Sequence, residues 1–134
     1  MIRYSQRRDL KIEQILPIYE AHNWSSAKKP ELLYKALLNS HSLVSAWHEE
    51  ELVGIGNAIS DGFLVVYYPH LLVSPKYQGQ GIGKEIINIL KNKYRDLHMH
   101  MLTADAEAVD FYKKCGFVRA GKTEPMWIYD GQDH

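Results

Sequence analysis

Residues 71–84 read Leu-Leu-Val-Ser-Pro-Lys-Tyr-Gln-Gly-Gln-Gly-Ile-Gly-Lys, and this is the most informative segment of the chain. An apolar strand runs through Pro75 into glycines at alternate positions, Gly79, Gly81 and Gly83, and then into helix-forming sequence. Glycine tolerates positive φ and leaves backbone N–H groups accessible, while the N-terminal end of the following helix attracts anions. The stretch therefore predicts a backbone cradle for a phosphate or pyrophosphate group.

The spacing of the glycines excludes two common phosphate loops. A dinucleotide-binding fingerprint needs G-x-G-x-x-G, but the position three after Gly81 is Lys84. A Walker loop needs G-x-x-x-x-G-K-[ST], but Gly83 and Lys84 are followed by Glu85. For this motif alone, an alternative interpretation is a glycine-rich turn whose role is to let strand and helix pack closely.

Length and composition narrow the class of protein. We expect residues 1–134 to form a single domain, because 134 residues suffice for one core and leave no room for a second. Sixteen basic and sixteen acidic residues balance, so no nucleic-acid partner is expected. Residues 1–9 lack the apolar segment of a signal peptide, and no apolar run reaches the ~20 residues of a membrane helix. The single cysteine, Cys115, suits a reducing cytoplasm.

Hydrophobic periodicity predicts a chain that alternates helices and strands. Pro17 requires the first helix to start near Glu13 to Leu16 or to be kinked, and Asp105 is expected to cap the fourth. Because of Pro69, the strand that otherwise continues to Val73 should be interrupted or bulged near residues 69–72. The expected fold is α/β (α+β), with one mixed sheet and helices on its faces. The predicted helices are 13–22, 30–40, 82–94 and 106–115, and the strands are 2–5, 43–47, 52–59, 63–68, 98–102, 117–120 and 126–129.

Two motifs together resemble one enzyme superfamily. Gln78-x-x-Gly81-x-Gly83 resembles the acetyl-coenzyme A (acetyl-CoA) signature of the GNAT N-acetyltransferases. Phe111-Tyr112-x-x-x-Gly116-Phe117, further along the chain, resembles the segment that closes the core of that family. The resemblance extends from Ile2 to Tyr129, and within the superfamily the chain is similar to compact single-domain amine acetyltransferases.

The resemblance implies how acetyl-CoA would be bound. It implies a mostly antiparallel sheet with about four flanking helices and with central strands that splay apart. The pantetheine arm would lie along one strand, and the pyrophosphate would rest on the amides of the glycine loop. The residues expected to bind the coenzyme are Leu71, Leu72, Val73, Gln78, Gly79, Gln80, Gly81, Ile82, Gly83 and Lys84.

The resemblance also supplies the general acid, while the base is chosen on chemical grounds. Tyr112 matches the family position whose phenol lies near the coenzyme sulfur, and a phenol can protonate a leaving thiolate. His70 is the candidate general base, because its imidazole has an ordinary pKa near neutrality. Acidic residues are frequent near this position in related enzymes, so a water relayed by Tyr68 or a backbone carbonyl is an alternative.

For the acceptor, His22, Trp24 and Tyr68 are the substrate candidates, and an aromatic wall favours a small aryl or alkyl amine. The expected reaction is direct acetyl transfer in a ternary complex. A peptide acceptor and a non-catalytic acyl-CoA sensing module are the alternatives. His98 and His100 are two possible ligands without a nearby third, so no metal is expected. A homodimer is expected only by analogy with the family.

Overall fold

The longest strand, β3 (Glu51–Ser60), organises the sheet. On one side it pairs with β2 (Ser42–His48), which in turn pairs with β1 (Ile2–Ser5). On its other side it has two partners in succession, since β5 (Leu71–Val73) pairs with residues 54–56 and β4 (Val65–Tyr67) pairs with residues 59–60. All these pairings are antiparallel, and only β6 (Met99–Met101) joins the sheet in parallel, alongside β4. The central strands therefore part between β5 and β4.

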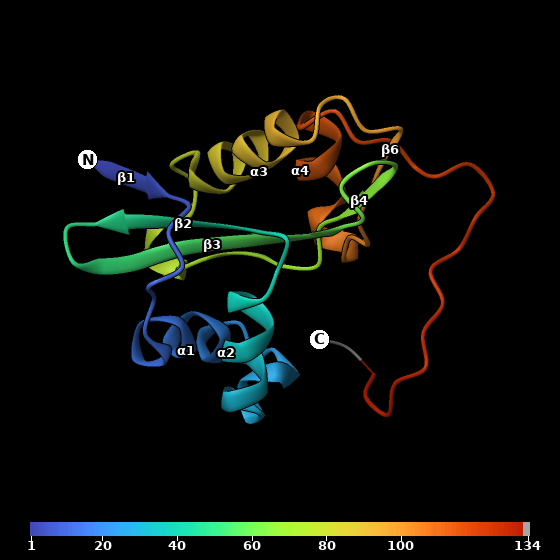
Figure 1. Cartoon of the computed structure of the whole chain (residues 1–134). Coiled ribbons are helices and arrows are strands. Elements are labelled where there is room, and N and C mark those ends of the chain that lie inside the picture. Colours follow the sequence, from blue (N-terminus) through green and yellow to red (C-terminus); the bar gives the residue numbers. More distant parts are fainter. Residues whose placement is uncertain (133–134) are drawn as a thin grey trace.

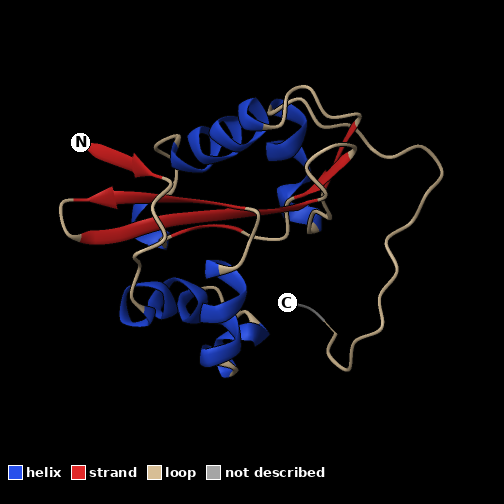
Figure 2. Cartoon of the chain, in the orientation of Figure 1, coloured by secondary structure: helices blue, strands red, loops and turns tan. Residues whose placement is uncertain are grey.

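The computed structural model describes residues 1–132, and its helices cover both faces of this sheet (Figures 1 and 2). Helices α1 (Ile12–Ala21) and α2 (Pro30–Leu38) lie on one face, together with the short 3-10 helix η1 (Ser25–Lys28). Helices α3 (Ile82–Lys93) and α4 (Val109–Lys114) lie on the other. Two further 3-10 turns, η2 (Pro75–Tyr77) and η3 (Ala106–Ala108), precede α3 and α4.

Alternating side chains of the central strands supply a separate core to each helical layer. Val44 and Ala46 belong to the core that includes Ile86 of α3, whereas Leu43 and Trp47 belong to the core that includes residues of α1 and α2. Helix α3 approaches β3 closely because β3 carries glycine at positions 54 and 56. A Cβ atom added at Gly56 would lie 2.6 Å from Cγ2 of Ile86, which is closer than real contacts allow.

Most of the predicted elements are confirmed, with ends within one or two residues. Helix α1 begins at Ile12 and runs through Pro17 as one element. Helix α2 begins at Pro30, as a proline at the first helical position favours. The sheet is mixed and mostly antiparallel with four flanking α-helices, as the resemblance implied. None of the helices within residues 1–132 is both long and apolar enough to span a membrane.

Three local predictions are wrong. Phe63 and Leu64 form a turn instead of starting β4, because the Asp61 carboxylate accepts hydrogen bonds from their amides at 2.8 and 2.7 Å. The side chain of Asp105 makes no cap hydrogen bond, and the segment after it opens with the 3-10 turn η3. Residues 117–120 and 126–129 form no strand and lie in a segment that leaves the body of the protein (Figure 1).

Candidate functional site

The glycine loop presents a bare backbone at the start of α3. Gly79 and Gly81 have φ values of 79° and 83°, which side-chain-bearing residues rarely adopt. Gly81 is the N-cap of α3, and no side chain hydrogen-bonds to this helix start. A Cβ atom added at either glycine would meet no atom within 4 Å, so the space above the loop is open. Uncapped amides, open space and a helix N-terminus together fit a pyrophosphate.

A buried asparagine holds the point where β3 changes partner. The backbone N–H of Asn57 donates to the carbonyl of His70 at 3.1 Å, and the N–H of His70 donates to Oδ1 of Asn57 at 3.0 Å. The amide Nδ2 of Asn57 donates to Oγ of Ser40 at 2.9 Å. The Asn57 residue is 3% exposed. Because these bonds fix the chain between β4 and β5, they hold the parted strands in place.

A cleft of about 760 Å³ opens beside these parted strands. It joins the glycine loop, the β5 strand, α4 and the end of α1 into one cavity, and every coenzyme residue predicted from the sequence lines it except Gln80. The three substrate candidates line it too. Its lining includes Leu71, Leu72, Val73, Gln78, Gly79, Gly81, Ile82, Gly83 and Lys84, which were predicted to bind the coenzyme, Phe111 and Tyr112 from α4, and His22, Trp24 and Tyr68, which were predicted to contact the acceptor.

Tyr112, in α4, lines the cleft, and its surroundings keep the phenol protonated. Its ring packs edge-on against Phe111 and Phe117, at centroid distances of 5.1 and 5.9 Å. Burial, with smaller contributions from Cys115 and Asp105, raises the pKa of Tyr112 to about 12. The hydroxyl group therefore retains its proton at neutral pH, as a proton donor must.

His22 lines the cleft, and its hydrogen bond defines which ring nitrogen carries the proton. Its Nε2 lies 2.7 Å from the carbonyl oxygen of Val73, which also accepts from Nε2 of Gln78 at 3.3 Å. A carbonyl oxygen only accepts, so Nε2 of His22 must carry the proton. In a neutral ring this leaves Nδ1 of His22 as the nitrogen able to accept a proton.

His70 lies beside the cleft residues Pro69 and Leu71, but its side chain is not part of the cleft lining. Its Nδ1 is 2.7 Å from the hydroxyl of Tyr19, and its ring packs edge-on against Trp24 at 4.9 Å. Burial raises the pKa of Tyr19 well above its ordinary value, so this phenol keeps its proton. We assign that proton as donated to Nδ1, which puts the proton of a neutral His70 ring on Nε2.

Asn57 and Tyr19 were not among the residues predicted from the sequence. Asn57 interrupts an otherwise apolar run, Gly54 to Ile59, and a polar residue in such a run was the available signal. Tyr19 gave no signal, because tyrosine is common on the apolar face of a helix. Tyr68 was predicted, and the structure adds that its hydroxyl lies 2.7 Å from Nδ1 of His100.

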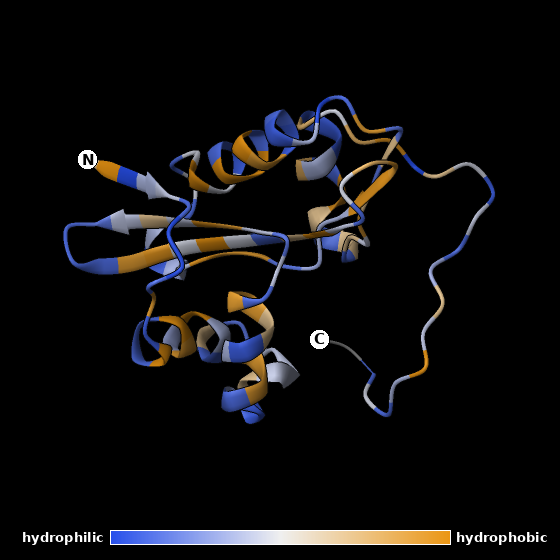
Figure 3. Cartoon of the chain, viewed as in Figure 1, coloured by the Kyte–Doolittle hydropathy of each residue, from blue (hydrophilic) through white to orange (hydrophobic). Residues whose placement is uncertain are grey.

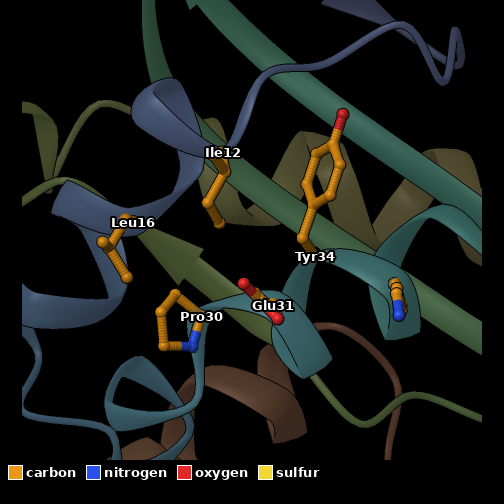
Figure 4. Close-up of a pocket in the computed structure, with 6 residues that line it drawn as sticks. Ile12, Leu16, Pro30, Glu31 and Tyr34 are labelled. Carbon is orange, nitrogen blue, oxygen red and sulfur yellow. The ribbon is translucent and has the colours of Figure 1, made fainter.

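A second hollow, of about 400 Å³, lies between α1 and α2 (Figure 4). Its lining is mainly apolar, and Tyr34, one of its residues, donates a hydrogen bond to the carbonyl of Leu10 at 2.6 Å. None of the predicted site residues lines it. The residues that do are Ile12, Leu16, Pro30, Glu31, Tyr34 and Lys35.

Known proteins with related sequences and folds are acetyltransferases. A chloroplastic GCN5-related N-acetyltransferase 2 of Arabidopsis thaliana is 39% identical over 71 residues, which cover 52% of this chain and 28% of that protein. An uncharacterized N-acetyltransferase of Pyropia yezoensis is 28% identical over 88% of this chain and 71% of its own length. A solved GNAT-family acetyltransferase from Streptococcus pneumoniae TIGR4 superposes with a TM-score of 0.85 at 28% identity, over 98% of this chain and 100% of that one.

A family profile decides the assignment. The profile described as an acetyltransferase (GNAT) domain matches residues 7–126. That range includes the glycine loop, the parted strands and the Tyr112 segment, which are the features that form the cleft. The chain therefore belongs to the GNAT family of acetyltransferases.

Proposed function

We propose that this acetyltransferase moves the acetyl group of acetyl-CoA directly onto a small primary amine. The observation that carries the proposal is the continuity of the cleft, which runs from the glycine loop past Tyr112 to the aromatic and imidazole side chains at the end of α1. Both substrates would therefore occupy one cavity. Direct transfer is further supported because the single cysteine, Cys115, is buried and is not part of the cleft lining.

The residues of the chain fit acetyl-CoA. The uncapped amides of the glycine loop suit its diphosphate, Lys84 adds a positive charge, and the edge of β5 facing the gap suits its extended arm. When bound, the coenzyme supplies a thioester whose acyl group an amine can attack. The rest of the chemistry is proton transfer, for which the chain must supply a donor and an acceptor.

Tyr112 is the proposed proton donor to the departing coenzyme thiolate. The proposal is supported because Tyr112 lines the cleft from α4 and its raised pKa keeps the phenol protonated at neutral pH. A thiolate is a weaker base in water than such a phenolate, so complete transfer of the proton to it is uphill. Tyr112 is therefore expected to stabilise the departing sulfur by donating a hydrogen bond as negative charge accumulates there, and the proton that the base takes from the amine replaces any proton that Tyr112 gives up.

His22 has the geometry for accepting the proton of the amine. It lines the cleft and holds its Nδ1 unprotonated through the bond from Nε2 to Val73. His70, the candidate from the sequence, stays a prediction, and the hydrogen bond from Tyr19 favours a role in supporting Trp24. If His22 is the base, His22→Ala removes the acidic limb of the kcat/KM profile, while His70→Ala leaves that limb in place. The opposite pattern would return the role to His70.

The acceptor end of the cleft supports a small cationic amine. Trp24 and Tyr68 provide aromatic surface, and the carboxylates Asp105 and Glu107 also line the cleft. Aromatic faces and carboxylates both attract an ammonium group before it loses its proton. A peptide acceptor is the alternative within the same chemistry, and it would be expected to use an open groove instead of an aromatic pocket.

The proposal is tested by coenzyme release over a panel of arylalkylamines, polyamines, amino acids and short peptides. We expect the highest kcat/KM for a small amine, and preference for the peptides would overturn the small-amine proposal. Binding is tested separately by thermal denaturation. Acetyl-CoA at about 100 times its Kd should raise the free energy of unfolding by about 2.7 kcal/mol. Absence of any shift at saturating acetyl-CoA would contradict coenzyme binding itself.

A further inference from the structure

A half-buried lysine of α3 contacts the end of α4, the helix that carries Tyr112. Hydrophobic and hydrophilic residues are interspersed along α3 (Figure 3), and Lys91 directly follows the buried Leu90. Nζ of Lys91 donates a hydrogen bond to the carbonyl oxygen of Cys115, the residue that ends α4. Within residues 1–132, no carboxylate lies at ion-pair distance from Lys91. The cation is therefore directed at a backbone carbonyl instead of at a carboxylate.

The chain leaves α4 through a Schellman motif that begins at Tyr112. The N–H of Phe117 donates to the carbonyl of Tyr112 at 3.0 Å, and the N–H of Gly116 donates to the next carbonyl at 3.1 Å. Gly116 has a φ of 97°, in the left-handed region that this motif requires. The carbonyl of Cys115 takes no part in the two bonds of the motif, and Lys91 supplies a donor for it. Lys91 therefore completes the end of the helix on which Tyr112 lies.

The same lysine also contacts the ring that packs on the phenol. Nζ of Lys91 lies 5.7 Å from the centroid of the Phe117 ring, within the range of a cation–π contact. That ring packs edge-on against the ring of Tyr112, at a centroid distance of 5.9 Å. Gly116 leaves space for the ammonium group, because a Cβ atom added there would lie 3.1 Å from Nζ of Lys91. One cation thus reaches Tyr112 both through the backbone and through a side chain.

We propose that Lys91 is a positioning residue for acetyl transfer, which holds the phenol of Tyr112 toward the departing coenzyme sulfur. Lys91 is not among the residues that line the cleft, so it acts through the end of α4 and the ring of Phe117. Helix α4 has only six residues, and so short a helix depends on contacts from neighbouring elements. This role of Lys91 rests on the proposed function, in which Tyr112 is the donor. Helix α3, whose first turn is expected to hold the coenzyme, would then also orient the residue that acts on its sulfur.

The first experiment asks whether Lys91 acts through Tyr112. Lys91→Met keeps an apolar stem but removes the donor, and we expect kcat to fall by about tenfold because the phenol is misplaced. In the Tyr112→Phe background the same substitution should lower kcat by less than about twofold, because the group that Lys91 positions is already absent. Lys93→Met, which removes an exposed lysine of the same helix, is the matched control and should leave kcat unchanged. Equal losses in the two backgrounds, or no loss in Lys91→Met, would overturn the proposal.

A conservative variant separates the cation from the shape of the side chain. Lys91→Arg keeps a positive charge and N–H donors at this position, so it should retain most of the wild-type kcat. The KM for the amine and the Kd for acetyl-CoA should stay close to their wild-type values in both variants. A kcat for Lys91→Arg as low as that of Lys91→Met would contradict a role of the cation.

The second experiment measures the position of α4 without measuring activity. Amide hydrogen exchange, followed by NMR, reports the N–H groups of Gly116 and Phe117 that form the Schellman motif. In Lys91→Met these two amides should exchange at least about tenfold faster, while the amide of Ile87 in the middle of α3 should keep its rate. Unchanged exchange at Gly116 and Phe117 would overturn positioning by Lys91 and leave the proposed function intact. Faster exchange, combined with a wild-type kcat for Tyr112→Phe, would instead refute the phenol as the donor and leave Lys91 a structural role alone.

Discussion

The coenzyme side and the acceptor side of the cleft are built differently. The coenzyme side consists of backbone, with positive φ at Gly79 and Gly81 and the uncapped start of α3. The acceptor side consists of side chains, with His22 bonded to Val73 and Trp24 packed on His70. These contacts join α1 and its following turn to strand β5 and the residue before it, which lie about fifty positions later in the chain.

This difference suggests that specificity for the acceptor can change independently of specificity for the coenzyme. A backbone cradle depends on a few local conformations and recognises a group that is the same for all acetyl-CoA enzymes. An acceptor wall depends on long-range packing, so a single substitution there can change the shape of the cleft. We therefore expect a substitution on one side to affect the binding of one substrate and to leave that of the other unchanged.

The largest effect is expected where the two sides meet. Tyr112→Phe should lower kcat by about 100-fold, because it removes the proton donor, while the Kd for acetyl-CoA should change little. Pre-steady-state or steady-state coenzyme release gives kcat, and calorimetry gives the Kd. Tyr4→Phe, in β1 and outside the cleft lining, is the control. If Tyr112→Phe turns over at the wild-type rate, this phenol is not the acid.

The next effect concerns the residue that holds the strands apart. Asn57→Ala should lower the free energy of unfolding by about 2 kcal/mol, because it removes the acceptor of the part-buried His70 amide and the donor to the Ser40 hydroxyl, which keeps only its bond to the carbonyl of Ala36. Urea denaturation measures this loss. Asn88→Ala, on the exposed side of α3, is the control and should cost far less. Equal losses for the two variants would show that Asn57 has no special role.

A smaller effect should be confined to the coenzyme side. Gly81→Val should weaken acetyl-CoA binding by about tenfold, because valine strains at a φ of 83° and the loop amides turn away. The KM for the amine should remain close to the wild-type value. Gly121→Val introduces valine at another positive φ, 60°, in the segment after Phe117 and outside the cleft lining, and it should leave coenzyme affinity unchanged. A shift of the amine KM instead would break the separation of the two sides.

The smallest effect is expected at the turn before β4, away from both sides. Three backbone amides donate to Oδ1 of Asp61, and these bonds lower the pKa of its carboxyl group below the ordinary value. Since the folded-state pKa is lowered, this stabilisation is present at neutral pH and is lost as the pH falls through that pKa. Asp61→Asn keeps an acceptor oxygen that does not titrate. The free energy of unfolding of Asp61→Asn relative to that of wild type should therefore increase from pH 7 to pH 3, and unfolding in urea measures it. Asp96→Asn is the control, and its free energy of unfolding relative to that of wild type should show no such increase.

The same contrast explains how much the sequence predicted. The helices, the main strands and the glycine loop follow from local periodicity and from glycine spacing, and they were predicted within one or two residues. The strand at Phe63 was wrong because a single carboxylate, Asp61, captures the amides there. The prediction of strands at 117–120 and 126–129 was wrong, because a strand forms only where a neighbouring strand pairs with it, and residue propensity does not show whether such a neighbour exists. The Asn57 contacts and the packing of His70 join distant residues, so no local pattern predicted them.

The absence of a side chain at Gly54 and at Gly56 has a consequence for the affinity expected for the coenzyme. It lets Ile82 and Ile86 rest directly on β3, and these two isoleucines stand at the beginning of the helix whose first amides face the open space. A side chain added at Gly54 or Gly56 would push the start of α3 away from β3 and would reorient its first backbone N–H groups. If this helix start binds the coenzyme as proposed, its affinity for the coenzyme should therefore also depend on Gly54 and Gly56, which lie outside the cleft lining.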